Sequence, residues 1–136
     1  MATSSKPGVL IVDDQPTHRR LAARALSTLD VNILEAKSGE EAVAIAQQEH
    51  ELCVALLDVH MPGMNGYDLA SELQQRTNTA ALPVIFISAT ESEAAHRQKA
   101  YKTSAVDFLS RPVSPHILLS KVRVFLELFL QRRQLQ

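Results

Sequence analysis

The chain has 136 residues, with 46% hydrophobic and 21% charged residues and a formal net charge of −1. This length suits one domain with its own core and is short for two. The near-neutral charge gives no electrostatic basis for binding nucleic acid or an anionic membrane. No apolar run approaches the roughly 18 residues that span a bilayer and no signal peptide is visible, so we expect a soluble, cytoplasmic domain.

Five apolar, β-prone runs alternate along the chain with segments of helical periodicity. The helical segments open on start signals such as a first-turn proline, or Ser or Thr three residues before Glu. In chain order we predict a lead-in at 1–7, a strand at 9–12, a helix from Pro16, a strand at 32–35, a helix after Ser38, a strand at 52–57, a helix over 67–73, a strand at 83–87, a helix from Thr90 to about Ala100, a strand at 106–109 and a helix from Pro115 to the C-terminus.

This alternation, with short connections, predicts an α/β fold in which helices cover both faces of an open parallel sheet. The sole cysteine, Cys53, excludes an internal disulfide and lies in an apolar run. We therefore expect it to be a small buried hydrophobic side chain.

Polar residues follow four of the predicted strands: Asp13 and Asp14 the first, Asp58 the third, Ser88 the fourth and Arg111 the fifth. The carboxyl ends of parallel strands meet at one edge of the sheet, where ligands bind in open α/β sheets. Each residue alone is more often a turn or cap element. Their joint placement predicts a functional site.

Three carboxylates at one edge repel one another unless a cation joins them, and an oxygen-rich site suits Mg²⁺. A carboxylate beside Mg²⁺ can act as a nucleophile toward phosphorus and form an acyl phosphate. Ser88 can donate to a phosphoryl oxygen, and Arg111 can neutralise its charge. The set suffices for phosphorylation of Asp58, although it includes no evident leaving-group acid.

Four motifs contain these residues: Val12-Asp13-Asp14 with Pro16, Leu57-Asp58-Val59-His60-Met61-Pro62-Gly63-Met64-Asn65-Gly66, Ile87-Ser88-Ala89 and Asp107-Phe108-Leu109-Ser110-Arg111-Pro112. Together they resemble the receiver domain of two-component response regulators, from about Gly8 to Leu130. The similarity implies a flavodoxin-like, three-layer α/β/α domain over residues 8–130, with strand order 2-1-3-4-5 and five helices.

The resemblance implies that Asp58 accepts a phosphoryl group from a phosphohistidine on a histidine kinase or a histidine phosphotransfer protein. It also implies that Asp13, Asp14, Asp58 and the backbone carbonyl of His60 hold Mg²⁺. Such a domain is a signalling phosphoacceptor rather than an enzyme.

The resemblance further implies a switch. Ser88 would be the hydroxyl that moves to bond the phosphoryl group, and Phe108 the coupled aromatic that turns inward. Both motions would alter the face made by the helix at about 90–100, the strand at 106–109 and the last helix. The positions that flank the site and tune phosphoryl lifetime are His60 and Thr90, with Met61 and Pro62 beside them.

Two residues depart from the family pattern. Arg111 stands where the family normally has Lys. The arginine guanidinium is planar and permanently charged, so it is not equivalent to the compact ammonium of lysine. We expect phosphorylation to persist, with Arg111 pairing with Asp58 and the phosphoryl group. Ser104 stands where Gly is usual, and we expect only a small backbone adjustment. The remaining histidines, His18, His50, His96 and His116, show no spacing that joins them into a site.

The last helix carries apolar residues on more faces than one domain can bury, and 131–136 extends it without Gly or Pro. We expect a coiled-coil start or a linker, serving a homodimer or a downstream output domain. The face of the fourth helix, fifth strand and last helix is the other candidate for a homodimer.

Two other functions remain open. Because Arg111 replaces the usual Lys, the domain could be a degenerate receiver that acts as a phosphorylation-independent docking or dimerisation module. An aspartyl-phosphate phosphohydrolase also uses an Asp nucleophile with Mg²⁺. It generally has a second acid two residues later, where this chain has His60. A nucleotide-binding domain is disfavoured because no Gly-rich loop follows the first strand.

Overall fold

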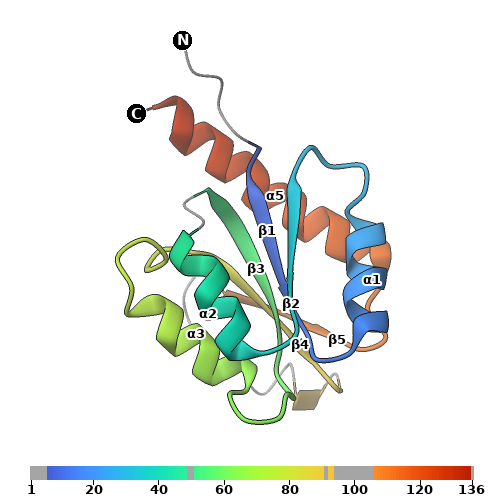
Figure 1. The fold of residues 1–136 in the computed structure, drawn as a ribbon. Helices are drawn as coiled ribbons and strands as arrows, with labels where there is room; N and C mark the ends of the chain where they lie inside the picture. The colour runs from blue at the N-terminus through green and yellow to red at the C-terminus, as the bar shows by residue number, and fades with distance from the viewer. Residues whose placement is uncertain (1–5, 49–50, 91, 94–105, 136) are drawn as a thin grey trace.

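The computed structural model describes residues 6–48, 51–90, 92–93 and 106–135, and Figure 1 shows a twisted sheet between two layers of helices. The parallel sheet has the order β2-β1-β3-β4-β5, as predicted. In chain order the elements are β1 (Gly8–Val12), α1 (Pro16–Ala25), β2 (Asn32–Ala36), α2 (Gly39–Gln48), β3 (Leu52–Asp58), α3 (Gly66–Gln74), β4 (Val84–Ser88), β5 (Val106–Ser110) and α5 (Pro115–Gln134).

The helix expected from Thr90 to about Ala100 lies mostly outside the described residues. Its first turn shows the expected cap, because the Glu93 N–H donates to Thr90 Oγ1 at 3.1 Å. Ser104, residues 1–5 of the lead-in, and Gln136 also lie outside the described part of the chain. No helix in the described ranges is long and apolar enough to cross a membrane.

The sheet has a separate hydrophobic core on each face because successive strand residues point to opposite sides. In β1, Leu10 and Val12 join the core beneath α2 and α3, whereas Val9 and Ile11 join the core beneath α1 and α5. Every residue of β1, β3 and β4 is buried, which explains their nearly continuous apolar sequences.

Cys53 lies within β3 at 1% exposure and is a buried thiol, as predicted. Burial raises the pKa of Cys53 to about 11. At neutral pH the side chain is therefore a protonated, unreactive core group.

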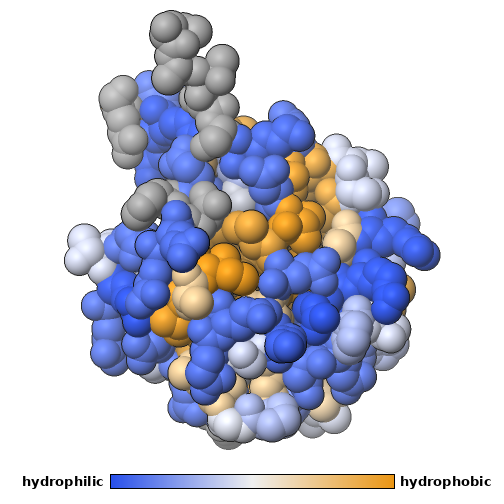
Figure 2. Space-filling model, in the orientation of Figure 1, coloured by the Kyte–Doolittle hydropathy of each residue, from blue (hydrophilic) through white to orange (hydrophobic). Residues whose placement is uncertain are grey.

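The edge strand β2 is less covered, with only Ala36 fully buried. In Figure 2 the corresponding face of the molecule is mostly hydrophilic, with hydrophobic surface visible in the middle between α2 and α1. The half-buried Ile33 and Leu34 belong to the two cores.

The predicted helix starts are present. Ser38 Oγ accepts from the Glu41 N–H at 3.1 Å, and the Glu41 carboxylate accepts from the Lys37 N–H at 2.9 Å, one residue earlier than the capping box requires. Ser114 Oγ accepts from the Ile117 N–H at 3.4 Å, with Pro115 in the first turn of α5.

Gly66 lets the start of α3 pack directly on the end of β3. Its N–H donates to the Val59 carbonyl at 3.3 Å. A Cβ at this position would lie 2.5 Å from the Asp58 carbonyl oxygen and 3.1 Å from Val59 Cα. These neighbours are backbone atoms, so they move only if the end of β3 moves. Gly66 thus fixes where Asp58 stands relative to the loop that follows it.

We predict that Gly66→Ala lowers the free energy of unfolding by about 1–3 kcal/mol, the usual cost of overpacking. Urea unfolding followed by circular dichroism measures this change. Ser71→Ala, at an exposed position of the same helix, is the matched control and is expected to unfold like the wild type. Equal unfolding curves for wild type and Gly66→Ala would contradict the prediction.

Candidate functional site

Three carboxylates gather at the carboxyl edge of the sheet. Asp13 and Asp14 follow β1 directly, and Asp58 is the last residue of β3, which is the neighbour of β1 in the sheet. One carboxylate oxygen from each residue lies within 4.8 Å of the others. Asp13 and Asp58 are each 5% exposed, whereas Asp14 is exposed. The cluster is an oxygen-only donor set open to water on one side, which fits a hard divalent cation.

The surroundings of Asp58 disfavour its charge. Burial raises the pKa of Asp58 above its ordinary value, and repulsion from Asp13 raises it further. Two donors oppose this: the His60 N–H at 3.1 Å from Oδ1, and the Arg111 guanidinium. The pKa of Asp58 still stands above its ordinary value, so these two donors compensate the carboxylate charge only in part.

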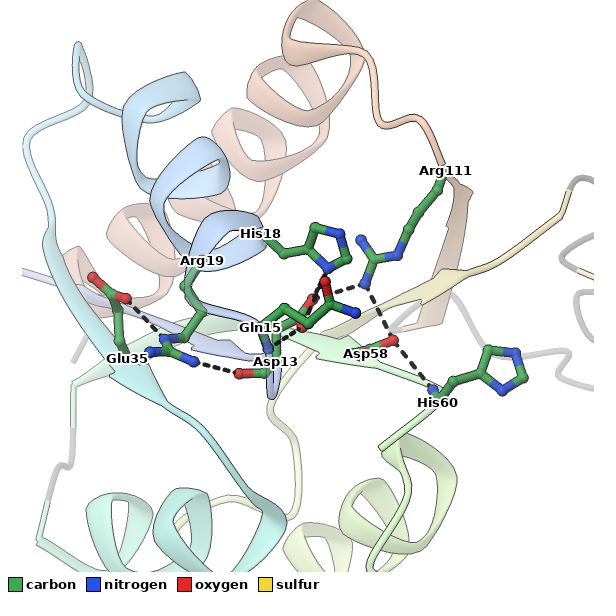
Figure 3. Close-up of polar contacts among 8 residues, drawn as sticks. All are labelled: Asp13, Gln15, His18, Arg19, Glu35, Asp58, His60 and Arg111. Carbon is green, nitrogen blue, oxygen red and sulfur yellow. Dashed lines mark hydrogen bonds and ion pairs between the residues drawn. The ribbon is translucent and has the colours of Figure 1, made fainter. Parts of the chain in front are cut away.

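Arg111 is the cation of the site. Its Nη2 donates to Asp13 Oδ2 at 2.7 Å and lies 3.2 Å from Asp58 Oδ1, so one nitrogen serves both carboxylates (Figure 3). This differs from a bidentate pairing of the fork with Asp58. The Arg111 N–H also donates to the Ser88 carbonyl at 2.9 Å, which ties the residue after β5 to the end of β4.

Asp13 is held by residues that the sequence did not single out. Its Oδ1 accepts from the Gln15 N–H at 2.9 Å, and His18 Nδ1 lies 3.1 Å from Oδ2. Arg19 Nη1 donates to the Asp13 carbonyl at 2.8 Å, while its Nε donates to Glu35 at 3.1 Å (Figure 3). The spacing of the histidines joins His18 to no site. The signal that points to its contact with Asp13 is its place in the first turn of α1, directly after the end of β1.

Ser88 and Phe108 occupy buried positions on β4 and β5, the two strands that follow β3 in the sheet. Ser88 is the last residue of β4, which is paired with β3, and is 0% exposed. Its Oγ has no hydrogen-bond partner among the described residues. Phe108 in β5 is 7% exposed, with its ring 5.2 Å from that of Phe86 between centroids.

The flanking positions divide into exposed and buried ones. The His60 side chain is exposed, and its Nε2 lies 2.9 Å from Glu93 Oε1. Its backbone N–H, in contrast, faces Asp58 (Figure 3). Pro62 is exposed, and Thr90 is exposed at the cap described above. Met61 is 8% exposed and belongs to the core beneath α2 and α3.

A mostly apolar groove of about 660 Å³ opens next to the carboxylates, between α1 and the loop that joins β5 to α5. Asp13, His18 and Arg111 form its polar end, and Leu21, which is 58% exposed, lies on its lining. The groove therefore borders the site on the side of Asp13 and Arg111.

The sequence matches the family model described as the response regulator receiver domain over residues 9–123. Protein PilH of Pseudomonas aeruginosa is 33% identical over 118 residues, which are 87% of this chain and 96% of that protein. The probable transcriptional regulator ycf27 of Cyanophora paradoxa is 34% identical over 122 residues, 90% of this chain. The chain spans only 49% of the length of ycf27 and 47% of SrrA of Staphylococcus aureus.

Solved structures show the same architecture. The chemotaxis protein CheY4 of Vibrio cholerae superposes with a TM-score of 0.76 at 26% identity, covering 89% of this chain and 99% of that one. A two-component transcriptional regulator AraC of Clostridium phytofermentans gives a TM-score of 0.79 at 26% identity, covering 93% and 98%. The chain therefore belongs to the response regulator receiver domain family, the signalling phosphoacceptors of two-component systems that bind Mg²⁺ at an acidic pocket.

Proposed function

We propose that this chain is a phosphorylation-driven switch that accepts a phosphoryl group on Asp58 from a partner histidine kinase or phosphotransfer protein. The single observation that carries the proposal is the carboxylate cluster itself, with the buried Asp58 beside Asp13 and under the Arg111 guanidinium. A structural role alone gives no reason to bury two carboxylates within reach of one cation.

The proposed step is an in-line displacement. An oxygen of Asp58 forms a bond to phosphorus, the phosphorus–nitrogen bond of the phosphohistidine breaks, and its electron pair stays on the imidazole. Asp13, Asp14, Asp58 and the His60 carbonyl would hold Mg²⁺, which supplies charge neutralisation on the phosphoryl oxygens. The remaining compensation comes from the Arg111 guanidinium.

Ser88 and Phe108 are the proposed switch residues. The Ser88 hydroxyl is buried without a partner in the described part of the chain, so it has a donor to offer to an oxygen on Asp58. Phe108 lies on the adjacent strand, packed against Phe86. Movement of Ser88 toward the phosphoryl group would vacate space next to these rings. The output would then be read on the face that includes β5 and α5.

A second function, a docking module that works without phosphate, is favoured by one observation. Arg111 Nη2 lies closer to Asp13, at 2.7 Å, than to Asp58, at 3.2 Å. A guanidinium that stays on Asp13 would compete with a metal ion for the same oxygen. Phosphorylation assays separate this module from the switch.

We predict that incubation with phosphoramidate or acetyl phosphate and Mg²⁺ adds one phosphoryl group to the chain, seen by intact mass. Asp58→Asn is expected to show no adduct because the amide is not a nucleophile. Asp68→Asn, at an exposed position of α3, is the matched control and keeps the adduct. Absence of an adduct on the wild type with either donor would favour the docking module.

We predict that Arg111→Ala slows phosphoryl uptake at least about tenfold, since it removes the protein's cation from the developing charge. Arg111→Lys is expected to retain uptake because it keeps a positive charge at the position. The rate is measured by mass spectrometry at fixed donor concentration, with Arg123→Ala, an exposed position of α5, as the control. Wild-type rates in Arg111→Ala would exclude a role for the guanidinium.

We predict that Asp58→Asn raises Tm by a few degrees at neutral pH in EDTA. A carboxyl whose pKa is raised on folding stabilises the fold below its unfolded pKa, and this contribution is lost as pH rises through the folded value. The neutral amide avoids that loss, so the difference from wild type shrinks as pH falls toward the ordinary aspartate range.

Mg²⁺ is expected to raise the Tm of the wild type and to leave that of Asp58→Asn nearly unchanged, because binding to the folded state alone stabilises it. Differential scanning fluorimetry measures both effects. A lower Tm for Asp58→Asn in EDTA at neutral pH would show that Arg111 and His60 already compensate the charge.

A further inference from the structure

The helix α5 carries a second apolar surface that the domain does not cover. Its buried residues Leu118, Val122 and Leu126 pack on the sheet. On another side of the helix, Ile117, Val124, Leu128 and Leu135 are 50%, 54%, 45% and 87% exposed. A helix whose only role is to cover a sheet has one apolar stripe.

The exposed residues follow a heptad together with the half-buried Lys121. Steps of four, three, four, three and four residues join Ile117, Lys121, Val124, Leu128, Gln131 and Leu135. In coiled-coil notation Lys121, Leu128 and Leu135 take position a, and Ile117, Val124 and Gln131 take position d. We name these six residues the α5 seam.

Contacts on the inner side of the helix fix which way the seam faces. Arg133 Nη2 donates to Glu51 Oε1 at 2.8 Å, and its guanidinium lies 4.9 Å from the centre of the Phe129 ring. Figure 1 shows the C-terminal turns of α5 running past the amino ends of the strands. The helix end is thus held against the domain by Arg133, with Leu128 and Leu135 left in water.

We propose that a second copy of this chain covers the α5 seam, forming a parallel two-stranded coiled coil centred on Val124 and Leu128. Charge supports this occupant and this orientation. Glu127 takes position g and Arg132 takes position e of the next heptad, the two positions that meet across a parallel pair. Both are exposed and opposite in sign, so two Glu127–Arg132 ion pairs form by symmetry.

An antiparallel pair lacks these ion pairs. In an antiparallel pair, g positions of one helix face g positions of the other. Glu127 would therefore face Glu127, Ser120 or Gln134 of the other copy, and none of these carries a positive charge. Lys121 is the one polar residue at position a of the seam, and such a residue specifies register and oligomer state in coiled coils. Its ammonium keeps its partner Asp107 at 2.7 Å beside the seam.

Sedimentation equilibrium of the full chain across micromolar to millimolar concentrations tests the pairing. We expect a monomer–dimer equilibrium whose dissociation constant rises at least tenfold in Val124→Glu/Leu128→Glu. Leu130→Glu, which is also on α5 but off the seam at 38% exposure, is the matched control and dimerises like the wild type. Circular dichroism verifies that each variant is folded.

Two further variants test the orientation. Glu127→Arg is expected to weaken the dimer, and Glu127→Arg combined with Arg132→Glu to restore it. Leu128→Cys is expected to form a disulfide-linked dimer under mild oxidation, because position a meets position a only in a parallel pair. The buried Cys53 does not interfere.

The proposal is independent of phosphorylation at Asp58. It is overturned by a chain that stays monomeric at all concentrations, which would leave the seam to another partner or to water. It is equally overturned by a trimer or tetramer, by a dimer that Val124→Glu/Leu128→Glu leaves intact, or by a Leu128→Cys chain that does not cross-link.

Discussion

The Arg111 guanidinium between Asp13 and Asp58 is the interaction on which the rest of the site depends. A parallel sheet with β1 and β3 as neighbours forces the two carboxylates to one edge, where both are buried. Charges about 4 Å apart at an effective dielectric of 20 interact by about 4 kcal/mol, so an uncompensated pair would be costly. The strand order supplies the cation, because β5 beside β4 brings Arg111 over both residues.

The compensation is partial, and that is a functional property. One nitrogen serves both carboxylates, and the pKa of Asp58 still stands above its ordinary value. A divalent cation therefore has a favourable place to bind, since more positive charge is needed than the protein provides. In the proposed function, phosphorylation of Asp58 would add further negative charge at the same point. Mg²⁺, Arg111 and the Ser88 hydroxyl would then act on one oxygen-rich centre.

The fold and the carboxylate cluster could be predicted from the sequence, whereas the contacts that hold Asp13 could not. Apolar runs and helix-start signals fix element type and order, and parallel topology then places Asp13, Asp58 and Ser88 together. Gln15 binds Asp13 from the turn after β1, and His18 and Arg19 bind it from the first turn of α1. The place of these residues at the helix start is a signal for such contacts, but it does not say which side chain makes which bond. The sharing of one Arg111 nitrogen is also set by side-chain geometry, which residue types alone do not determine.

The two apolar faces of α5 require different residue spacings, and the sequence of the helix provides both. Leu118, Val122 and Leu126 need spacing near 3.6 to follow a sheet, whereas the α5 seam needs 3.5 to follow another helix. Over twenty residues these periods drift apart, so an anchor has to set the rotation of the far end. Arg133 is that anchor, because its ion pair with Glu51 ties the last turns to the segment before β3. The seam therefore keeps a defined direction relative to the carboxylate cluster, which lies at the other end of the strands from the last turns of α5 (Figure 1).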